Sequence, residues 1–242
     1  MDKPFFLPFV KKEQLTKDAF TFFFKRNGNE RDFVPGQTYE MKLPHKNMDE
    51  RGDSRIFTIS SSPTDKDFIT ITTRIIQSTF KFELNNLKPE QNVQFDGPWD
   101  DLNFNPNNTN PHVFLAGGIG ITPFHSILQY VIDKNIETQM ILFVSWKNRE
   151  EMVFDDFFRA ANNRLENFSY VPTLTDERLT SDLWDGELGR IDQKLIEKYV
   201  LEIGHAKYFF AGPPAMVGSL KQTVLDMGVP KENLLAEEFE GY

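Results

Sequence analysis

The 242-residue sequence contains no cysteine. Disulfides, cysteine-ligated zinc and cysteine-ligated iron–sulfur clusters are therefore excluded within this chain. The absence of disulfides fits a reducing compartment. Histidine is also scarce, at four residues, and none has the spacing of a metal-ligand motif. We therefore predict no metal site, and we expect a cytoplasmic protein.

Long hydrophobic runs and an excess of positive charge are missing as well. No apolar run approaches the ~20 residues that cross a bilayer, and the first residues lack the charged-then-apolar layout of a signal peptide. The formal net charge of −9 argues against binding to nucleic acid or to an anionic membrane surface. We expect a monomer without a transmembrane segment.

Phenylalanine is abundant, at 24 residues, and most of these rings should lie in a core. A chain of this length suits one large domain or two small ones. Up to residue 104 the sequence consists mainly of short β-branched or aromatic runs, which predict an antiparallel β-barrel or sandwich. The predicted strands are 5–10, 19–25, 38–43, 56–60, 68–76 and 93–96, and the one helical candidate is 80–87.

A turn-rich stretch of asparagine and proline at 105–111 ends this pattern. After it, predicted strands (113–116, 140–145, 168–172, 207–211) alternate with predicted helices (123–133, 150–163, 192–201, 213–227). Such alternation predicts a parallel sheet with helices on both faces. We therefore predict two domains, a β-barrel over residues 1–108 and an α/β domain over 109–242. Ligands of such sheets bind at the strands' C-terminal ends, here the loops 117–123, 146–149, 173–177 and 212–216.

The run Gly117-Gly118-Ile119-Gly120-Ile121-Thr122-Pro123 joins the first strand and helix predicted for the α/β domain. A turn of this kind brings backbone N–H groups at a helix N-terminus close to a phosphate, and glycine avoids a blocking Cβ. A lone glycine motif is a weak signal, and this spacing is not the dinucleotide fingerprint G-x-G-x-x-G. From this run alone, an ordinary tight turn remains an equal alternative.

Further motifs lie on both sides of this run. The barrel region carries Arg55-Ile56-Phe57-Thr58, followed by small residues and a proline, and later Thr72-Thr73-Arg74 with a predicted helix start at Ser78. The α/β region carries Gly212-Pro213-Pro214-Ala215-Met216 and ends on Glu237-Glu238-Phe239-Glu240-Gly241-Tyr242. In this order, the motifs resemble those of the ferredoxin–NADP reductase family of flavoenzymes over nearly the whole chain.

The resemblance implies an FAD site in the barrel. Arg55 would reach the flavin phosphates, Phe57 would pack on the flavin, and Thr58 would place a hydroxyl near flavin N5. Ser78 or Thr79 would cap a helix at the pyrophosphate, although Gln77 replaces the family's usual glycine. The implied set is Arg55, Phe57, Thr58, Ile59, Ser60, Thr72, Arg74, Ser78, Thr79, Phe80 and Lys81, with Phe239 or Tyr242 covering the flavin. A half-buried strand and a plain helix cap would explain the barrel residues without flavin.

The resemblance also implies an NAD(P)H site in the α/β domain, with Thr122 near the nicotinamide. The implied set is Gly117, Gly118, Gly120, Thr122, Pro123, Ser145, Lys147, Arg149, Gly212, Pro213 and Met216. Lys147 and Arg149 would face the adenosine ribose, where cations favour the 2′-phosphate of NADPH. Alternatively, they pair with nearby glutamates in solvent. Ala211 replaces a cysteine that relatives often carry near the nicotinamide.

Together these sites imply an FAD-dependent oxidoreductase that passes hydride from NAD(P)H, with NADPH favoured, to FAD. Thr58, Thr122 and Phe239 are the residues implied nearest to the reacting rings. No ferredoxin-like segment is fused, so electrons would pass to a separate acceptor such as ferredoxin, flavodoxin or a small molecule. The alternative is a non-catalytic FAD- or nucleotide-binding sensor, or an electron-input subunit of a larger complex.

Overall fold

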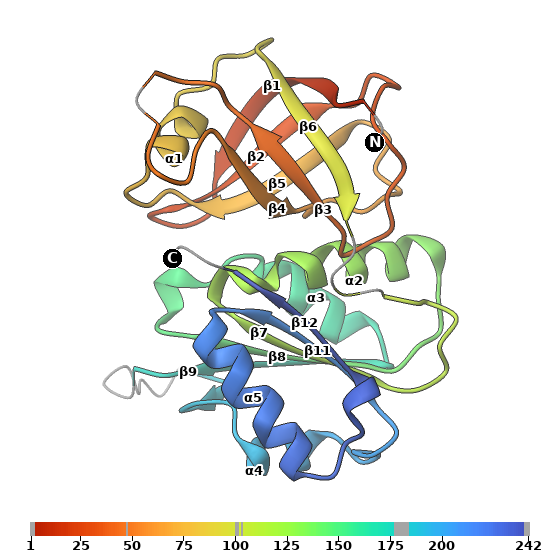
Figure 1. Ribbon diagram of the computed structural model, residues 1–242. Helices are drawn as coiled ribbons and strands as arrows, with labels where there is room; N and C mark the ends of the chain where they lie inside the picture. The colour runs from red at the N-terminus through yellow and green to blue at the C-terminus, as the bar shows by residue number, and fades with distance from the viewer. Residues whose placement is uncertain (1–2, 47, 100–101, 103, 177–183, 240–242) are drawn as a thin grey trace. The chain divides into compact units, whose positions relative to one another are not determined.

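The structure is a computed structural model that describes residues 3–46, 48–99, 102, 104–176 and 184–239. The chain forms two compact units (Figure 1). The first comprises residues 1–104 and 125–134, and the second comprises 105–124 and 135–242. Among the described residues, no helix is both long enough and apolar enough to cross a membrane.

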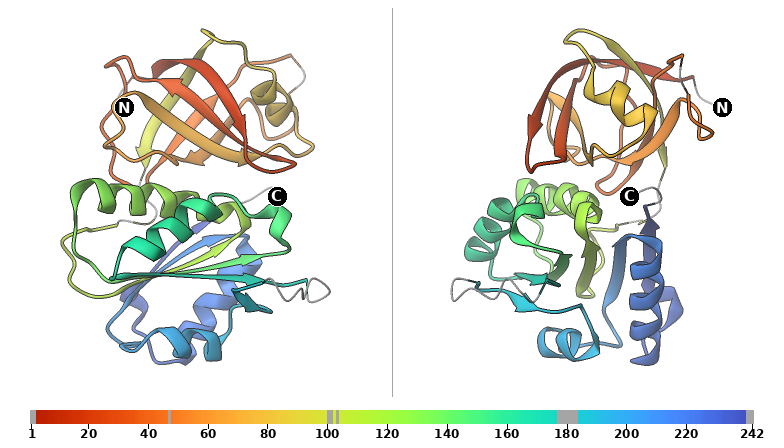
Figure 2. Two further views of the ribbon diagram at one scale, coloured as in Figure 1. Left: turned by 180° about the vertical axis from the view of Figure 1, so that it is seen from behind. Right: turned by 90° about the vertical axis from the view of Figure 1, so that its left-hand side faces the viewer.

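The first unit is an antiparallel barrel. Its six strands pair in the order β4-β3-β6-β1-β2-β5. An isolated antiparallel bridge between Ile59, just after β4, and Ile71 in β5 brings the two edges of this sheet together. Figure 2 shows this unit from two further sides. The strands are β1 (Phe5–Gln14), β2 (Ala19–Lys25), β3 (Thr38–Lys42), β4 (Ser54–Thr58), β5 (Phe68–Arg74) and β6 (Asn92–Trp99).

The barrel interior is filled largely by aromatic rings. Alternate residues of β1 point inward, so that Phe5, Leu7 and Phe9 are buried. Stacked and edge-on ring pairs continue this packing, including Phe24 with Phe95 at 5.0 Å between centroids. The short helix α1 (Thr79–Asn85) adds Phe80 to the same core. Many of the chain's phenylalanines therefore lie in this barrel core.

Not every phenylalanine of the barrel is in the core. Phe20, Phe23 and Phe68 are half-buried on strands β2 and β5. Each ring is covered by a lysine ammonium: Lys12 over Phe20 at 5.4 Å, Lys11 over Phe23 at 4.7 Å and Lys25 over Phe68 at 5.1 Å from the ring centroid. The lysine ammonium groups shield these three rings from solvent, which favours aromatic residues at partly exposed strand positions.

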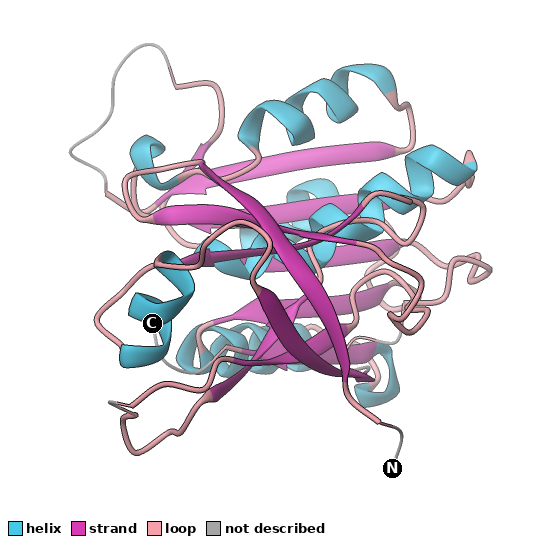
Figure 3. Ribbon diagram, turned by 90° about the horizontal axis from the view of Figure 1, so that it is seen from above, coloured by secondary structure: helices cyan, strands magenta, loops and turns pink. Residues whose placement is uncertain are grey.

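The second unit is built on a parallel sheet of six strands in the order β10-β9-β8-β7-β11-β12. Helices connect most of its strands (Figure 3). The strands are β7 (His112–Gly117), β8 (Met140–Trp146), β9 (Phe168–Leu174), β10 (Glu187–Leu188), β11 (Lys207–Gly212) and β12 (Leu234–Glu238). The helices are α3 (Asp155–Arg164), α4 (Gln193–Tyr199) and α5 (Pro214–Asp226), with short 3-10 turns η1 (Gly118–Ile121), η2 (Arg149–Glu151) and η4 (Lys231–Asn233). Helix α2 (Thr122–Lys134) begins in the second unit, and its residues 125–134 belong to the first.

Both faces of this sheet are covered, which explains why all six residues of β7 are buried. On one face, sheet residues such as Phe143 and Phe210 form a core with Leu195 of α4 and Leu220 of α5. On the other face, Phe114 contacts Phe124 at the start of α2, at 4.9 Å between ring centroids. Tyr170 there stacks on Phe158 of α3 at 5.4 Å. The predicted fold class is therefore confirmed in both parts.

The predicted elements differ from the observed ones mainly at their ends. The helix predicted from residue 150 begins only at Asp155, because η2 forms first and Phe154 has a left-handed backbone (φ 60°). Strand β12 was not predicted, since its sequence of three apolar residues followed by two glutamates has no apolar–polar alternation. It pairs in parallel with β11 and places Glu237 opposite Ala211. The barrel strand β1 extends past its predicted end through a bulge between Phe9 and Lys11.

Candidate functional site

The first unit gathers cations and aromatic rings around the residues assigned to flavin. Arg55 lies on β4 with its guanidinium carbon 5.2 Å from the centroid of the Phe80 ring. Lys81 Nζ lies 4.7 Å from the centroid of the Phe57 ring, and the two rings are themselves 5.9 Å apart. The strand and the helix thus bring four predicted residues into one cluster, which we call the Arg55–Lys81 cluster.

Lys81 is the unusual member of this cluster. Its ammonium donates a hydrogen bond to the hydroxyl of Thr73 on β5. Burial, followed by the positive charges of Arg55 and Arg51, lowers the pKa of Lys81 from 10.5 to about 7. A buried cation beside other cations gains most from a bound anion. The cluster therefore fits the phosphate groups of a dinucleotide such as FAD.

The orientation of Arg55 is fixed by several acceptors. One terminal nitrogen donates to Asp49 at 3.0 Å, and the other donates to the carbonyls of Arg51 (2.9 Å), Gly52 (3.2 Å) and Ser54 (2.6 Å). Asp49 also pairs with Arg51 at 3.3 Å, and these bonds hold its carboxyl pKa below the usual range against the opposing effect of desolvation. These bonds hold the guanidinium over the Phe80 ring.

Ser78 and Thr79 occupy the start of helix α1. Ser78 is the N-cap, and its hydroxyl accepts the backbone N–H of Lys81 at 3.4 Å. Thr79 is the first helical residue, and its hydroxyl accepts the backbone N–H of Asp49 at 3.2 Å. Of the two cap candidates, the structure selects Ser78. Gln77, which replaces the family's glycine, is exposed.

The hydroxyl residues of the flavin motif are buried, and Ser60 is bonded to threonines of β5. Thr58, Ile59 and Ser60 are at most 3% exposed. The Ser60 hydroxyl lies 2.9 Å from the hydroxyls of Thr70 and of Thr72. Thr72 in turn lies 2.8 Å from the Thr21 hydroxyl, while Arg74 forms an ion pair with Asp18 at 3.6 Å. The residue of this strand that reaches Lys81 is therefore Thr73, which was not among the predicted site residues.

In the second unit, the glycine-rich run forms the end of β7, the turn η1 and the start of α2. A Cβ on Gly117 would lie 2.4 Å from the sulfur of Met216, and one on Gly120 would lie 2.2 Å from the carbonyl oxygen of Ala211. Both distances are below van der Waals contact, so these glycines let the loops after β7 and β11 pack directly together. Thr122 is buried, and its hydroxyl donates to the Ile119 carbonyl at 3.2 Å.

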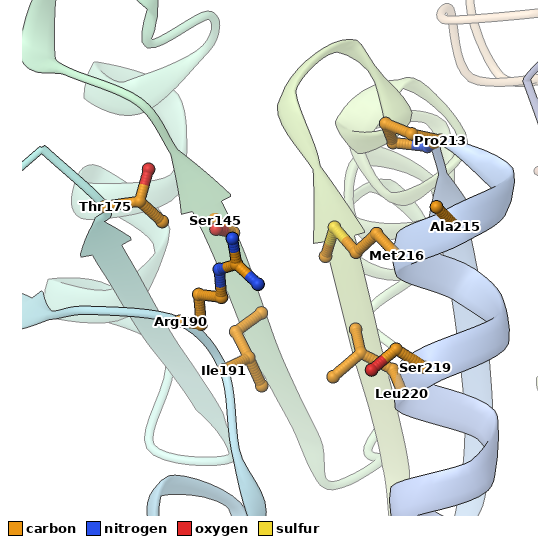
Figure 4. A pocket seen from close by; sticks show the side chains of 9 residues that line it. All are labelled: Ser145, Thr175, Arg190, Ile191, Pro213, Ala215, Met216, Ser219 and Leu220. Carbon is orange, nitrogen blue, oxygen red and sulfur yellow. The ribbon is translucent and has the colours of Figure 1, made fainter.

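A pocket of about 360 Å³ opens beside these loops, at the C-terminal ends of β8, β9 and β11 (Figure 4). Arg190 and Ile191 lie on one side of it, and Met216, Ser219 and Leu220 of α5 lie on the other. The remaining lining residues are Ser145, Thr175, Pro213 and Ala215. Ligands of parallel sheets bind at this edge, and the mixture of apolar walls with a few polar groups is typical of small-molecule sites.

Of the three residues predicted to face the adenosine ribose, one lines this pocket and two do not. Ser145 lines it, whereas Lys147 and Arg149 are not among its lining residues. Arg149 instead lies over the Trp184 ring, with its guanidinium carbon 5.0 Å from the centroid. The charged residue that lines the pocket is Arg190. No sequence signal marked Arg190, because the strand before it, β10, has only two residues.

The C-terminal motif lies beside the Gly212-Pro213-Pro214 turn. Gly212 is paired with Glu238 across β11 and β12, and the Phe239 backbone N–H donates to the Gly212 carbonyl at 3.0 Å. Glu237, opposite Ala211, is a buried carboxylate that was not among the predicted site residues. Tyr242, the rival of Phe239 for the flavin-covering position, lies outside the described residues.

Comparison with known proteins shows what the second unit and the whole chain are similar to. Residues 114–222 match the family model of the oxidoreductase NAD-binding domain. The chain is 26% identical over 205 residues to the F subunit of a Na⁺-translocating NADH-quinone reductase from Methylococcus capsulatus, covering 77% of this chain and 49% of that protein. It is 23% identical over 245 residues to flavohemoprotein A from Dictyostelium discoideum, covering 95% of this chain and 58% of that protein. The chain thus spans about half of these curated relatives.

The fold as a whole also has close counterparts. A ferredoxin NADP⁺ reductase from Neisseria gonorrhoeae, solved with bound FAD and NADP, superposes with a TM-score of 0.81 at 20% identity, covering 98% of this chain and 99% of that one. This likeness shows the fold, and it confirms the resemblance drawn from the motifs. The chain therefore has the two-domain fold seen in ferredoxin–NADP reductases, and its residues 114–222 match the model of the oxidoreductase NAD-binding domain.

Proposed function

We propose that this chain is an FAD-dependent oxidoreductase that takes hydride from NAD(P)H and passes electrons to a separate acceptor. In this proposal residues 1–108 bind FAD and residues 109–242 bind NAD(P)H. The observation that carries it is the presence, in one chain, of the Arg55–Lys81 cluster and of an NAD-binding domain with a pocket at its strand ends.

The barrel residues hold and orient the flavin. Arg55 and Lys81 bind its phosphates, while Phe57 supplies an aromatic surface beside them. Thr58 presents a hydroxyl at the ring edge. Bound FAD supplies the redox chemistry, since it takes up a hydride and releases electrons singly or as a pair. The protein's part is to bind, orient and shield the reacting groups.

The pocket of the second unit holds the nicotinamide cofactor. Its apolar wall of Ile191, Met216 and Leu220 suits an adenine or ribose face, and Ser145 and Thr175 offer hydroxyls. The loops at Gly117–Pro123 and Gly212–Pro213 contact the pyrophosphate of the cofactor, and Thr122 lies on the side of the nicotinamide. We favour NADPH over NADH, because cations suit the 2′-phosphate that only NADPH carries. Arg190 lines the pocket, and Lys147 follows the lining residue Ser145 by two positions in the sequence.

A second candidate function follows from the relatives' names. The Methylococcus relative is named as one subunit of a quinone reductase, and this chain matches 49% of it. The chain could thus work as an electron-input module whose acceptor is a neighbouring protein of the same complex. It would still be reduced by NAD(P)H, so the acceptor distinguishes this candidate from a free-standing reductase.

The test is anaerobic stopped-flow reduction of the purified, flavin-loaded protein by NADPH and by NADH in separate mixes. We expect bound flavin whose visible absorbance bleaches in a single reductive half-reaction, since no acceptor is present to reoxidise it, and faster bleaching with NADPH at low concentration. Protein that binds no FAD, or bound flavin that neither nucleotide reduces, would refute the proposed activity. Equal rates with both nucleotides would refute only the NADPH preference.

A further inference from the structure

The part of helix α2 that belongs to the first unit, residues 125–134, contacts the end of the flavin motif, just after strand β4. His125 Nδ1 lies 2.7 Å from the carbonyl oxygen of Ser60. The Ser126 hydroxyl donates to the carbonyl oxygen of Ser61, also at 2.7 Å. A carbonyl oxygen can only accept, so the His125 proton lies on Nδ1. Two consecutive helix residues thus hold two consecutive carbonyls.

The same two serines are held from the opposite direction by β5. The Ser60 backbone N–H donates to the Thr70 carbonyl at 2.9 Å, and the Ser61 hydroxyl accepts the Thr70 N–H at 3.0 Å. Ser60, Ser61 and Ser126 are all at most 6% exposed. A buried polar segment with bonds on both sides has few alternative conformations. The backbone path after Thr58 is therefore fixed jointly by β5 and α2.

We propose that His125 and Ser126 are positioning residues for the flavin, which they hold indirectly by fixing the Ser60–Ser61 backbone. This inference rests on the proposed function, because it assigns to the motif Arg55–Pro63 a role in binding FAD. When one of these bonds is removed, the segment samples other paths and only part of the population can bind flavin. The apparent affinity then falls in proportion to that part.

The test compares three single variants at α2. Ser126→Ala removes the hydroxyl, Ser126→Thr keeps it, and Ile127→Val is a matched core change in the same helix, since Ile127 lies beside Gly36 in the first unit. We expect Ser126→Ala to weaken FAD binding about threefold to tenfold, as one lost buried hydrogen bond predicts. It should also speed amide hydrogen exchange at Ser60 relative to Ile127→Val. Ser126→Thr keeps the hydroxyl but adds a methyl group at a fully buried position, so it should bind FAD more tightly than Ser126→Ala and show slower exchange at Ser60.

The readouts separate positioning from general stability. Ile127→Val lowers the melting temperature without touching the Ser60–Ser61 carbonyls, so it reports what destabilisation alone does to FAD affinity. The inference is overturned if Ser126→Ala and Ile127→Val bind FAD equally well at comparable melting temperatures. It is also overturned if exchange at Ser60 rises while FAD affinity stays at the wild-type value. Wild-type protein that binds no FAD refutes the proposed function itself, which is a different outcome from both.

Discussion

The lowered pKa of Lys81 makes flavin affinity depend on pH in a defined direction. Below about pH 7 this side chain is a cation, and above it the free protein holds it neutral. A bound phosphate favours the cation and raises its pKa toward the ordinary 10.5. Binding then takes up a proton at alkaline pH, so affinity must fall as pH rises through about 7. With one such group the loss is about 50-fold between pH 7 and pH 9.

The measurement is an FAD titration by flavin fluorescence from pH 6 to pH 9 on three proteins. Wild type should show the decline, Lys81→Arg should bind with little pH dependence because a guanidinium stays charged, and Lys81→Met should bind weakly at every pH. A wild-type affinity that is flat over this range, or a decline that persists in Lys81→Met, would refute the reasoning. Unfolding does not imitate the effect, because a lysine with a lowered folded-state pKa stabilises the fold progressively as pH rises from about 7 to 10.5.

Three further predictions concern other residues. Gly120→Ala should cost more than ~2 kcal/mol of unfolding free energy, because its Cβ would lie 2.2 Å from the Ala211 carbonyl oxygen, whereas Gly204→Ala, with open space around its Cβ, should cost under ~1 kcal/mol by urea denaturation. Similar losses in both would contradict the packing argument. Arg190→Ala should raise KM for NADPH about tenfold more than for NADH, and we also expect Lys147→Ala to affect NADPH more than NADH; steady-state kinetics with both nucleotides will show whether either residue contacts the 2′-phosphate. Burial lowers the pKa of His112 from 6.5 to about 4, so the unfolded chain binds a proton there that the fold does not, and unfolding free energy should fall as pH drops from 6.5 toward 4. Denaturation midpoints of His112→Gln should be less sensitive to pH in that window, and an unchanged slope would count against this origin.

The sequence motifs predicted which segments of the barrel lie side by side, but they did not predict the individual side-chain contacts. Residues 55, 57, 80 and 81 come from two motifs that are far apart in the chain, and the fold brings them together. The choice between Thr72 and Thr73 was beyond the motifs, because it depends on which face of β5 meets helix α1. Alternation along a strand is readable from sequence, but the face that a short helix covers is set by tertiary packing.

The α/β unit shows the same division. The alternating pattern predicted the parallel sheet and the strand ends where the pocket lies. Arg190 was missed because it follows β10, a strand of two residues that leaves no hydrophobic pattern. The glycines were assigned to ligand approach, yet Gly117 and Gly120 are already required by the contact of two protein loops. A glycine pattern alone cannot distinguish a close ligand from a close neighbour in the chain.

The three lysine-covered phenylalanines of the barrel have a practical consequence for chemical labelling. Acylation of Lys11, Lys12 or Lys25 would remove the positive charge that sits over each ring. It would leave the half-buried rings without their cations, including Phe23 and Phe68, which contact each other at 5.7 Å between centroids on neighbouring strands. Amine-reactive dyes should therefore make this protein prone to self-association. Reductive methylation, which retains the charge, is the lysine chemistry suited to preparing it for spectroscopy.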